Sequence, residues 1–553
     1  MEIQVKNLDH LGIVAGIVDQ IGLVEEIDRL VEPHPQQIIS TGQVVKAMIL
    51  NGLGFVSAPL YLFSEFFVGK ATEHLLGEGI KPEHLNDDRI GRALDSLSNQ
   101  GLTPLFTSVA MLAHQRFNLS TKSLHLDSSS FSLFGKYEIE SSDESLESIE
   151  GVKITYGYSK DYRPDLKQFM MDVICTGDGD VPLFVKIGDG NESDRAIFAQ
   201  LMKQFKQEWN LDSIYVADSA LYSAENIQQL GELNWITLVP RSIKTAKILA
   251  ESMPKEVFVE SEILGYQIAS CCCDYGGVRQ RWLVIESEKR RNSDLKQLEK
   301  KLTKQLEIAT SELKSLMKQD FACAADAEQA AKVLSRNWKY HSLESIVIET
   351  DPHYNQAGRP SKNQSPEYLT YRVTAQIVPV EAVIEIARTR AGRFILATNI
   401  LDEAVLSHDE VLIEYKGQQS SERGFRFLQD PLFFTSSVFV NTPRRVAALA
   451  MVMGLCLLVY TLAQRQLRHA LAHARETIPN QLKKPTYTPT LRWVFQCFQA
   501  VHLVHLVHLV HRQQVSNLTD ARLWILRFLG SACQKYYRDL NKIQAQTKPQ
   551  LSL

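Results

Sequence analysis

The hydrophobic pattern of residues 1–120 has the period of α-helices. Apolar residues recur every three to four positions over Leu11–Val31 and again after Ser40, where Ser40 and Gln43 form a capping box. No cluster of titratable residues stands out in this part of the chain, so it is expected to bind or assemble rather than to catalyse. Three further helices are predicted, over Leu60–Phe67, Arg89–Leu97 and Leu105–His114.

From Ser123 onward, apolar and polar residues alternate, which predicts β-strands. Asp127 lies in the middle of the first strand, SLHLDSSSFSLFG, and an acidic spacer over 138–150 follows it. Later strands are expected over Gln168–Cys175, Val181–Ile187, the segment SIYVAD that ends at Asp218, and 235–240, with helices that begin after Ser193 and Ser223. Three strands, a helix, a strand, a helix and a strand form the order of a ribonuclease-H-like α/β core with a mixed sheet.

The two aspartates of this predicted core are candidates for chemistry. An aspartate inside an apolar strand is costly unless it is paired or bound to a metal. Reactive groups of open α/β sheets collect at strand ends, and Asp218 ends its strand. Each residue taken alone is more simply explained as a satisfied acid of a turn or a strand end.

A third acid, Glu422, lies on a helix predicted from Ser407 to Pro431. Ser407 and Glu410 form a capping box, and the proline is a stop signal. Alone, the segment is typical of a solvated amphipathic helix, but with the two aspartates it completes a carboxylate set suited to Mg²⁺, which prefers oxygen ligands. The residues of the shared face are Tyr415, Gln418, Glu422 and Gln429, and the cations beside them are Arg423 and Arg426.

The 203 residues between Asp218 and Glu422 are far more than such a core needs, so they must include an inserted domain. Within it, Arg290–Met317 is predicted to be an amphipathic or coiled-coil helix, for which packing against a partner is favoured over contact with DNA. The short sequence GRPSK at 358–362 is more simply a loop than a DNA-binding hook. The expected segments are 1–120 (helical), 121–240 (first part of the core), 241–391 (insertion), 392–470 (second part of the core, with Glu422) and 471–553 (helical).

Composition changes this picture only locally. The net charge of −4 gives no global argument for nucleic acid, but residues 464–493 are strongly basic. The eight cysteines include no C-x-x-C pair, and the start of the chain is no signal peptide, so the cytoplasm is the expected compartment. Val446–Ala463 has the length of a membrane span, but a buried central helix is favoured. The histidine repeat at 501–512 lies in the predicted C-terminal helical region, where a slipped tandem repeat in the coding DNA is favoured over a metal site.

Five motifs in this order resemble those of bacterial insertion-sequence DDE transposases. The resemblance extends to the branch whose acidic helix carries a Tyr-x2-Arg-x3-Glu-x6-Lys signature, and to the helical N-terminal domain of such transposases. Gln418 stands where the signature has arginine, and Gln429 stands where it has lysine. The motifs are LHLDSSSFSLFG with Asp127, GYSKDYRPDLKQ (157–168), GDGNESD (188–194), VADSALYSAENI (216–227) and YKGQQSSERGFRFLQDPLF (415–433).

The resemblance implies phosphoryl transfer at the ends of a mobile DNA element. Asp127, Asp218 and Glu422 would bind two Mg²⁺ ions, for which Mn²⁺ can substitute. The implied partners are double-stranded DNA, as terminal inverted repeats and as target, and a second copy of the chain in a synaptic complex, with no membrane. Residues implied to contact DNA are Tyr415, Gln418, Arg423, Arg426 and Gln429.

Two other functions remain open at this stage. A ribonuclease-H-like nuclease that cuts DNA but does not join it would use the same three carboxylates. A catalytically silent DNA-binding relic of a transposase is suggested by Gln418 and Gln429, since both replace a cation of the signature.

Overall fold

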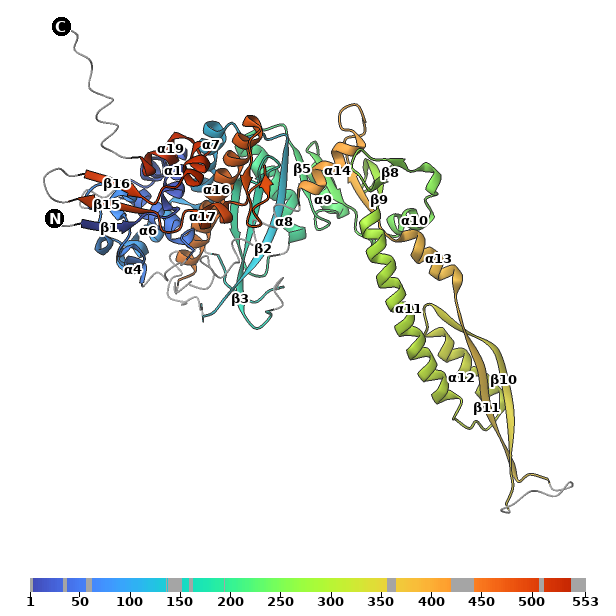
Figure 1. Cartoon of the computed structure of the whole chain (residues 1–553). Helices are drawn as coiled ribbons and strands as arrows, with labels where there is room; N and C mark the ends of the chain where they lie inside the picture. Colours follow the sequence, from blue (N-terminus) through green and yellow to red (C-terminus); the bar gives the residue numbers. More distant parts are fainter. Residues whose placement is uncertain are drawn as a thin grey trace, which may run out of the picture. The chain divides into compact units, whose positions relative to one another are not determined.

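The computed structural model describes residues 3–32, 37–55, 62–135, 137, 152–158, 163–192, 194–355, 365–418, 442–506 and 512–538 (Figure 1). The chain divides into two compact units. The first comprises Met1–Thr237, Gly276–Val278 and Ile413–Leu553, and the second comprises Leu238–Tyr275 and Arg279–Leu412. The segment expected as an insertion, 241–391, therefore lies in the second unit apart from the three residues Gly276–Val278. The N-terminal and C-terminal helical segments both lie in the first.

Helices form much of the first unit. The capping box of Ser40 and Gln43 is present at the start of α3, as predicted. The single helix expected over Leu11–Val31 is instead two helices, because Gly22 adopts a left-handed conformation (φ 73°) and ends the first of them. These helices are α1 (Leu11–Ile21), α2 (Leu23–Leu30), α3 (Thr41–Gly52), α4 (Phe63–Phe67), α5 (Thr72–Leu76), α6 (Asp87–Gln100), α7 (Leu102–Phe117), α16 (Pro443–Ala474), α17 (Leu491–Cys497), α18 (Asp520–Arg527) and α19 (Gly530–Gln534).

Helix α16 forms the centre of the first unit and contacts α1, α3, α6, α7 and the strand β4 (Pro182–Gly188). It is long and apolar enough to cross a membrane, but 94% of its most apolar window is buried inside the fold. This is the packing of a core helix. The prediction of a buried helix over Val446–Ala463 is confirmed.

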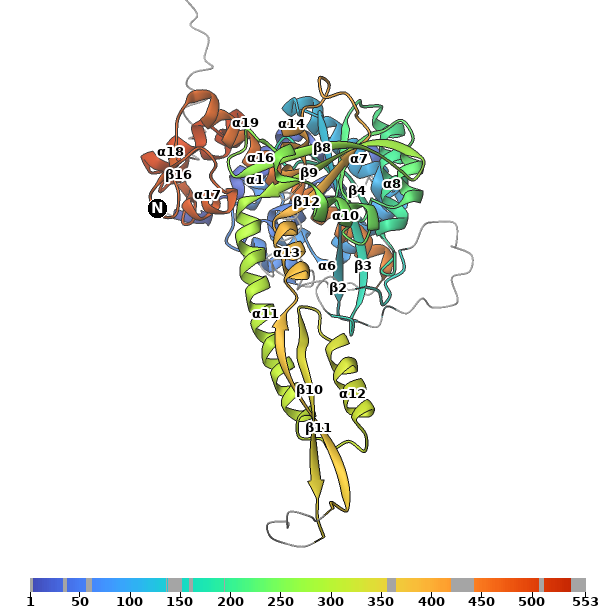
Figure 2. The same cartoon turned by 90° about the vertical axis from the view of Figure 1, so that its right-hand side faces the viewer.

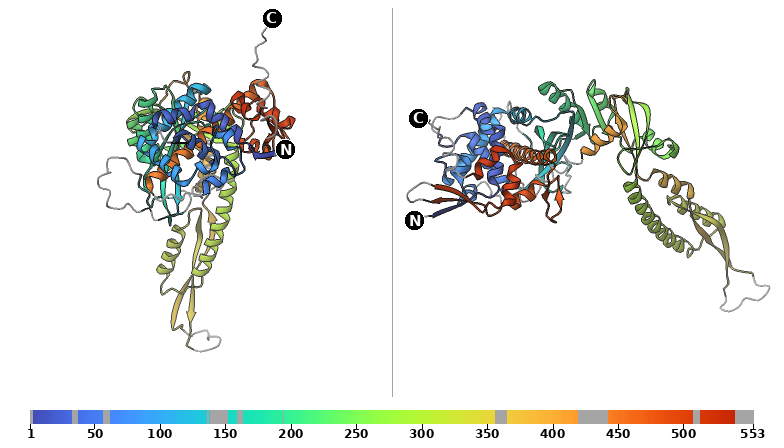
Figure 3. Two further views of the ribbon diagram at one scale, coloured as in Figure 1. Left: turned by 90° about the vertical axis from the view of Figure 1, so that its left-hand side faces the viewer. Right: turned by 45° about the horizontal axis from the view of Figure 1, so that its top comes forward.

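The C-terminal region is wrongly predicted as entirely helical. Residues of the histidine repeat form the strand β15 (His502–Leu506), which pairs antiparallel with β1 (Ile3–Asn7) and with β16 (Arg512–Ser516). The pairing joins the two ends of the chain, a contact that no local pattern reveals. Elements coloured blue and red accordingly lie side by side in both views of Figure 3.

The predicted α/β core is present in the same unit. Its strand order is β4-β3-β2-β5-β6, with β3 antiparallel to its neighbours and with β5 and β6 parallel to β2. Ser223 caps its second helix, as predicted, whereas Ser193 lies outside the described residues. The remaining elements are β2 (Ser123–Leu133), β3 (Lys167–Thr176), α8 (Asp194–Trp209), β5 (Ile214–Ala217), α9 (Ala224–Leu230) and β6 (Asn234–Leu238).

The second unit contains strands in the order β12-β9-β8-β7 and an arm built from two helices and a long hairpin (Figure 2). The helix predicted over Arg290–Met317 is α11 (Glu288–Leu316), which packs with α12 (Ala324–Arg336) on the hairpin of β10 (His341–His353) and β11 (Tyr368–Pro379). Leu316, Ala327, Ala331 and Val373 form the small core of the arm. The other elements are α10 (Lys244–Ser252), β7 (Val259–Glu260), β8 (Tyr266–Tyr275), β9 (Val278–Ser287), α13 (Glu381–Arg390), β12 (Arg393–Thr398) and α14 (His408–Gly417), which continues into the first unit.

A buried ion pair joins the N-terminal helices to the C-terminal end of the first unit. Asp19 on α1 accepts from the Lys46 ammonium of α3 at 2.7 Å and from the Tyr536 hydroxyl at 2.5 Å, and Lys535 lies 2.6 Å away. Burial raises the pKa of Asp19, but these three partners outweigh it and hold that pKa below its ordinary value.

We predict that Asp19→Asn destabilises the first unit by about 3 kcal/mol, because it leaves the buried Lys46 ammonium without a carboxylate. The expected measurement is a lower midpoint of urea denaturation at neutral pH. Since the pKa of Asp19 is lowered, the wild type loses this stabilisation as the pH falls through that pKa, and the two midpoints converge in acid. Asp165→Asn, at an exposed pair with Arg163, is the control and should leave the midpoint unchanged. An Asp19→Asn midpoint equal to that of the wild type at neutral pH would contradict the prediction.

Candidate active site

Two aspartates end up side by side because β2 and β5 pair in parallel. The register runs from Ser123 opposite Ile214 to Leu126 opposite Ala217, so Asp127 and Asp218 follow the last matched pair. Neighbouring strands lie about 4.8 Å apart, and residues at the same level of parallel strands project from the same face. Both aspartates are partly exposed.

Local hydrogen bonds fix the backbone around each carboxylate. One oxygen of Asp127 accepts from the N–H of Ser128 at 2.8 Å. One oxygen of Asp218 accepts from the N–H of Ala220 at 2.8 Å, which closes a turn at the end of β5. The Thr237 hydroxyl donates to the Asp218 carbonyl at 2.7 Å and so ties the strand end to β6.

The end of α14 packs directly on the face of β2 that carries Asp127. His125 shares that face, because side chains two residues apart on a strand point the same way. A Cβ atom added to Gly417 would lie 2.7 Å from the His125 ring, so only glycine allows this close approach. Glu414, one turn earlier, places its carboxylate 4.0 Å from the His125 ring nitrogen Nε2.

The pKa of the Glu414 carboxyl group agrees with this packing. Burial raises the pKa of Glu414, but the neighbouring side chains of His125 and Ser123 and the nearby charge of Lys122 outweigh it and hold that pKa below its ordinary value. An ionised carboxylate is therefore held next to the strand that carries Asp127.

The Asp127 and Asp218 pair fits a divalent cation. Two carboxylates at the same level of neighbouring strands offer oxygen ligands from one side, at a place that solvent reaches. Within the part of the chain that the structure describes, no group of three or more histidine, cysteine or acidic side chains gathers as a metal site. Glu422, the third predicted ligand, lies outside the described residues, as do Arg423, Arg426 and Gln429.

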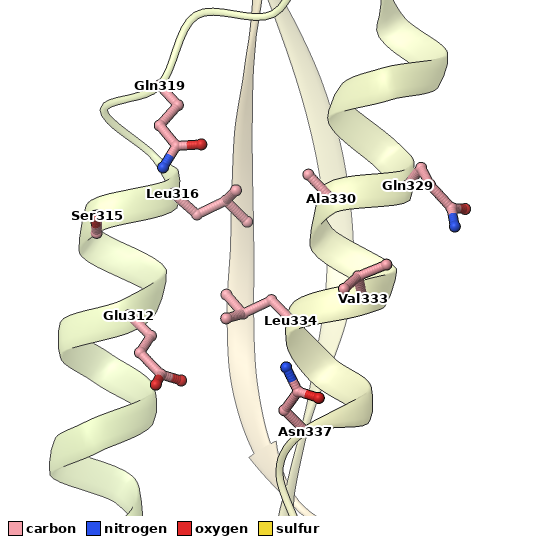
Figure 4. Close-up of a pocket in the computed structure, with 9 residues that line it drawn as sticks. All are labelled: Glu312, Ser315, Leu316, Gln319, Gln329, Ala330, Val333, Leu334 and Asn337. Carbon is pink, nitrogen blue, oxygen red and sulfur yellow. The ribbon is translucent and has the colours of Figure 1, made fainter.

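A groove on the arm of the second unit has a different character. It lies between α11 and α12, and apolar side chains such as Leu316 and Leu334 point into it (Figure 4). Its single ionisable residue is Glu312, whose carboxylate accepts from the Trp338 indole at 2.7 Å. With one acid already bonded, the groove offers no carboxylate pair for phosphoryl transfer.

Comparison with known protein families assigns the chain. Residues 126–392 match the family described as the transposase DDE domain, and residues 3–111 match a domain of unknown function, DUF4277. The chain belongs to the DDE transposases. The catalytic-domain match begins one residue before Asp127, includes Asp218 and ends before Glu422.

This transposase was also compared with curated protein sequences and with solved structures. No curated protein matches its sequence. A solved structure, the piggyBac transposase synaptic complex with hairpin DNA, is 8% identical and gives a TM-score of 0.36 over 100% of this chain and 86% of that one. Similarity at that level does not define a shared fold. The match to the transposase DDE domain is therefore the evidence that this protein cleaves and transfers DNA.

Gln418 of the transposase lies at the two strand ends that carry the aspartates. The side chain is 6% exposed, and its amide nitrogen lies 3.4 Å from the carbonyl of Leu126. In the opposite amide orientation it donates to the Ala217 carbonyl at 3.3 Å and accepts from the Asp218 N–H at 2.8 Å. Either orientation connects the end of α14 to the main chain immediately before a candidate metal ligand.

Tyr415, three residues before Gln418, is partly exposed, and its carbonyl accepts from the Gln418 N–H at 3.2 Å.

Some cations of the basic segment 464–493 bond to other residues of the protein, and others are exposed to solvent. Arg465 pairs with Asp178 at 2.5 Å, and Arg468 donates to the Pro489 carbonyl at 3.0 Å. The exposed cations of the segment include Arg475, Lys483 and Lys484. These remain the residues of this segment that we expect to contact DNA phosphates.

The sequence patterns did not single out His125, Glu414 or Gly417. His125 had a signal, because it precedes Asp127 by two residues and so shares its strand face. Glu414 and Gly417 had none, since their role depends on which face of α14 meets β2.

We predict that Gln418→Ala slows cleavage at saturating DNA and leaves the DNA dissociation constant unchanged, because the lost amide loosens the strand ends that carry Asp127 and Asp218. The loss of a buried hydrogen bond should also destabilise the fold by about 1–3 kcal/mol. Single-turnover cleavage and a binding titration measure the two effects separately. Ile413→Ala, at an exposed position of the same helix, is the matched control. Weaker DNA binding with a normal rate at saturation would instead favour the sequence-based prediction that Gln418 contacts DNA.

Proposed function

We propose that Asp127, Asp218 and Glu422 are the catalytic carboxylates of this transposase and that they hold two Mg²⁺ ions, for which Mn²⁺ can substitute. The observation that carries the proposal is the parallel register of β2 and β5, which supports a shared ligand pair of Asp127 and Asp218. Glu422 follows Gln418 by four residues, in the segment that the sequence predicts to be the signature helix.

The reaction is phosphoryl transfer at the ends of a mobile DNA element. When bound, Mg²⁺ would supply Lewis-acid stabilisation of the attacking and leaving oxygens. The carboxylates act as ligands and not as general bases, so the chemistry requires no histidine near the reacting phosphate. The turn that begins at Asp218 and the contact of Gln418 hold the ligand main chain fixed during turnover.

Substrate binding is assigned to basic and helical surfaces of the first unit. Exposed cations of 464–493, together with Tyr415, Arg423, Arg426 and Gln429, contact phosphates and hold the DNA end. Residues 1–120 recognise the terminal inverted repeats. Because two ends are joined to one target, the working form on DNA is a homodimer, and its compartment is the cytoplasm.

We predict that Asp127→Ala, Asp218→Ala and Glu422→Ala each abolish Mg²⁺-dependent cleavage of a duplex that carries an element end. Each variant should still bind that duplex, because the carboxylates repel rather than attract the phosphate backbone in the absence of metal. A strand-transfer assay with pre-cut ends should also give no joined product.

The matched control is Asp212→Ala, which removes an exposed carboxylate just before the opposite end of β5. It should cleave and join at the wild-type rate. Persistent cleavage by all three single variants would overturn the assignment of the carboxylates while leaving the family assignment intact.

A further inference from the structure

A small polar cavity lies in the second unit, at the base of the arm. Four of its lining residues, Asp294, Gln297, Leu298 and Lys301, are spaced i, i+3, i+4 and i+7 and so share one face of α11. The cavity volume is about 130 Å³. The other lining residues are Arg241, Tyr340, Ala387, Arg390 and Ala391.

Positive charge exceeds negative charge around this cavity. Three cations line it, Arg241, Lys301 and Arg390, against the single carboxylate of Asp294. Arg390 is paired with Glu251 at 3.1 Å, and one oxygen of Asp294 accepts from the N–H of Gly392 at 3.0 Å.

Two of the three cations form no ion pair within the part of the chain that the structure describes. The guanidinium of Arg241 donates to the Arg393 carbonyl at 3.2 Å. Over the described ranges of the chain, neither Arg241 nor Lys301 forms an ion pair with a carboxylate.

The guanidinium groups near the cavity repel one another. Partial burial of the guanidinium, together with the charges of Arg290 and Arg390, lowers the pKa of Arg241, and Asp294 offsets only part of this effect. Arg290 stacks over the Phe394 ring at 5.3 Å rather than on an acid. A bound anion would relieve this repulsion.

The size of the cavity restricts the ligand. Its volume is well above the space that a single water molecule needs. A tetrahedral oxyanion fits, whereas a nucleoside or another drug-sized ligand needs about 300 Å³ or more. We propose that this cavity binds one phosphate group, and that in the working transposase this group is a phosphodiester of the DNA backbone.

The surface beside the cavity favours DNA over free phosphate as the source. Residues 289–304 of α11 carry seven cations and two acids. Lys296, Lys300 and Lys304 are exposed and recur every four residues, so they extend positive charge along the helix next to Lys301. The DNA source rests on the proposed function, but the phosphate site itself does not.

The test compares the double variant Arg241→Gln/Lys301→Gln with Lys314→Gln/Lys318→Gln, which removes the same charge from exposed positions at the far end of α11 and just beyond it. Both proteins bind an end-bearing duplex and an unrelated duplex over a series of salt concentrations, without divalent metal. The slope of log K against log salt should fall by about 1 for the cavity variant, equally for both duplexes, and should not change for the control.

A second arm uses inorganic phosphate at constant ionic strength. Phosphate should raise the melting temperature of the wild type and of the control but not that of the cavity variant. Lys301→Arg, which keeps the charge, should behave like the wild type in both arms and shows that the fold tolerates substitution there.

The outcomes separate the possible sources of the anion. A lost phosphate effect with an unchanged DNA slope would support the anion site and overturn the DNA source. Wild-type behaviour of the cavity variant in both arms would overturn the whole proposal. Neither result bears on cleavage by the carboxylates, because Asp127→Ala should keep the wild-type salt slope while losing cleavage.

Discussion

The parallel pairing of β2 with β5 is the constraint on which the candidate active site depends. It sets Asp127 and Asp218 at the same level of neighbouring strands, about 4.8 Å apart along the sheet. Two carboxylates so close repel each other unless a cation compensates them. Backbone hydrogen bonds on both sides of β2 hold the strands in this register regardless of that repulsion. The fold thus holds two acidic side chains together at a place where a bound cation would offset their mutual repulsion.

The end of α14 meets this sheet through contacts that only a few residue types allow. Gly417 lets the helix approach the ring of His125, and Gln418 then reaches the main chain of β2 in one amide orientation and of the β5 end in the other. The long helix α16 buries its apolar surface against helices from the start of the chain and against β4. The strands that carry Asp127 and Asp218, the end of α14 and the terminal helices therefore belong to one unit, although they come from distant parts of the sequence.

Local patterns predicted those parts of the fold that local physics determines. The capping boxes at Ser40 and Ser407 are present, and the strand carrying Asp127 begins at Ser123 as expected and ends two residues earlier than predicted, at Leu133. The strand at His502–Leu506 was missed because one of its two partners, β1, lies almost five hundred residues away and supplies hydrogen bonds that a helix would otherwise make internally. Tertiary context outweighs local propensity in such a case.

The candidate site was predictable to a similar degree. The aspartates stood out because a charged residue in an apolar strand is unusual, and their juxtaposition followed from the strand order. The residues that pack around them could not be derived in this way. Glu414 and Gly417 matter because one face of α14 meets His125, and a helical period alone does not say which face is covered.

The buried position of Gln418 changes how its departure from the family signature is understood. An arginine side chain carries only donors, whereas a glutamine amide carries a donor and an acceptor. At this position the amide can donate to the Ala217 carbonyl and accept from the Asp218 N–H, and a guanidinium could make only the first of these bonds. We infer that glutamine at 418 can both donate to and accept from the main chain at the end of β5, which the arginine of the signature could not do. Because Gln418 is buried, its departure from the signature changes how the end of α14 is bonded to the sheet and does not remove a charge from the protein surface.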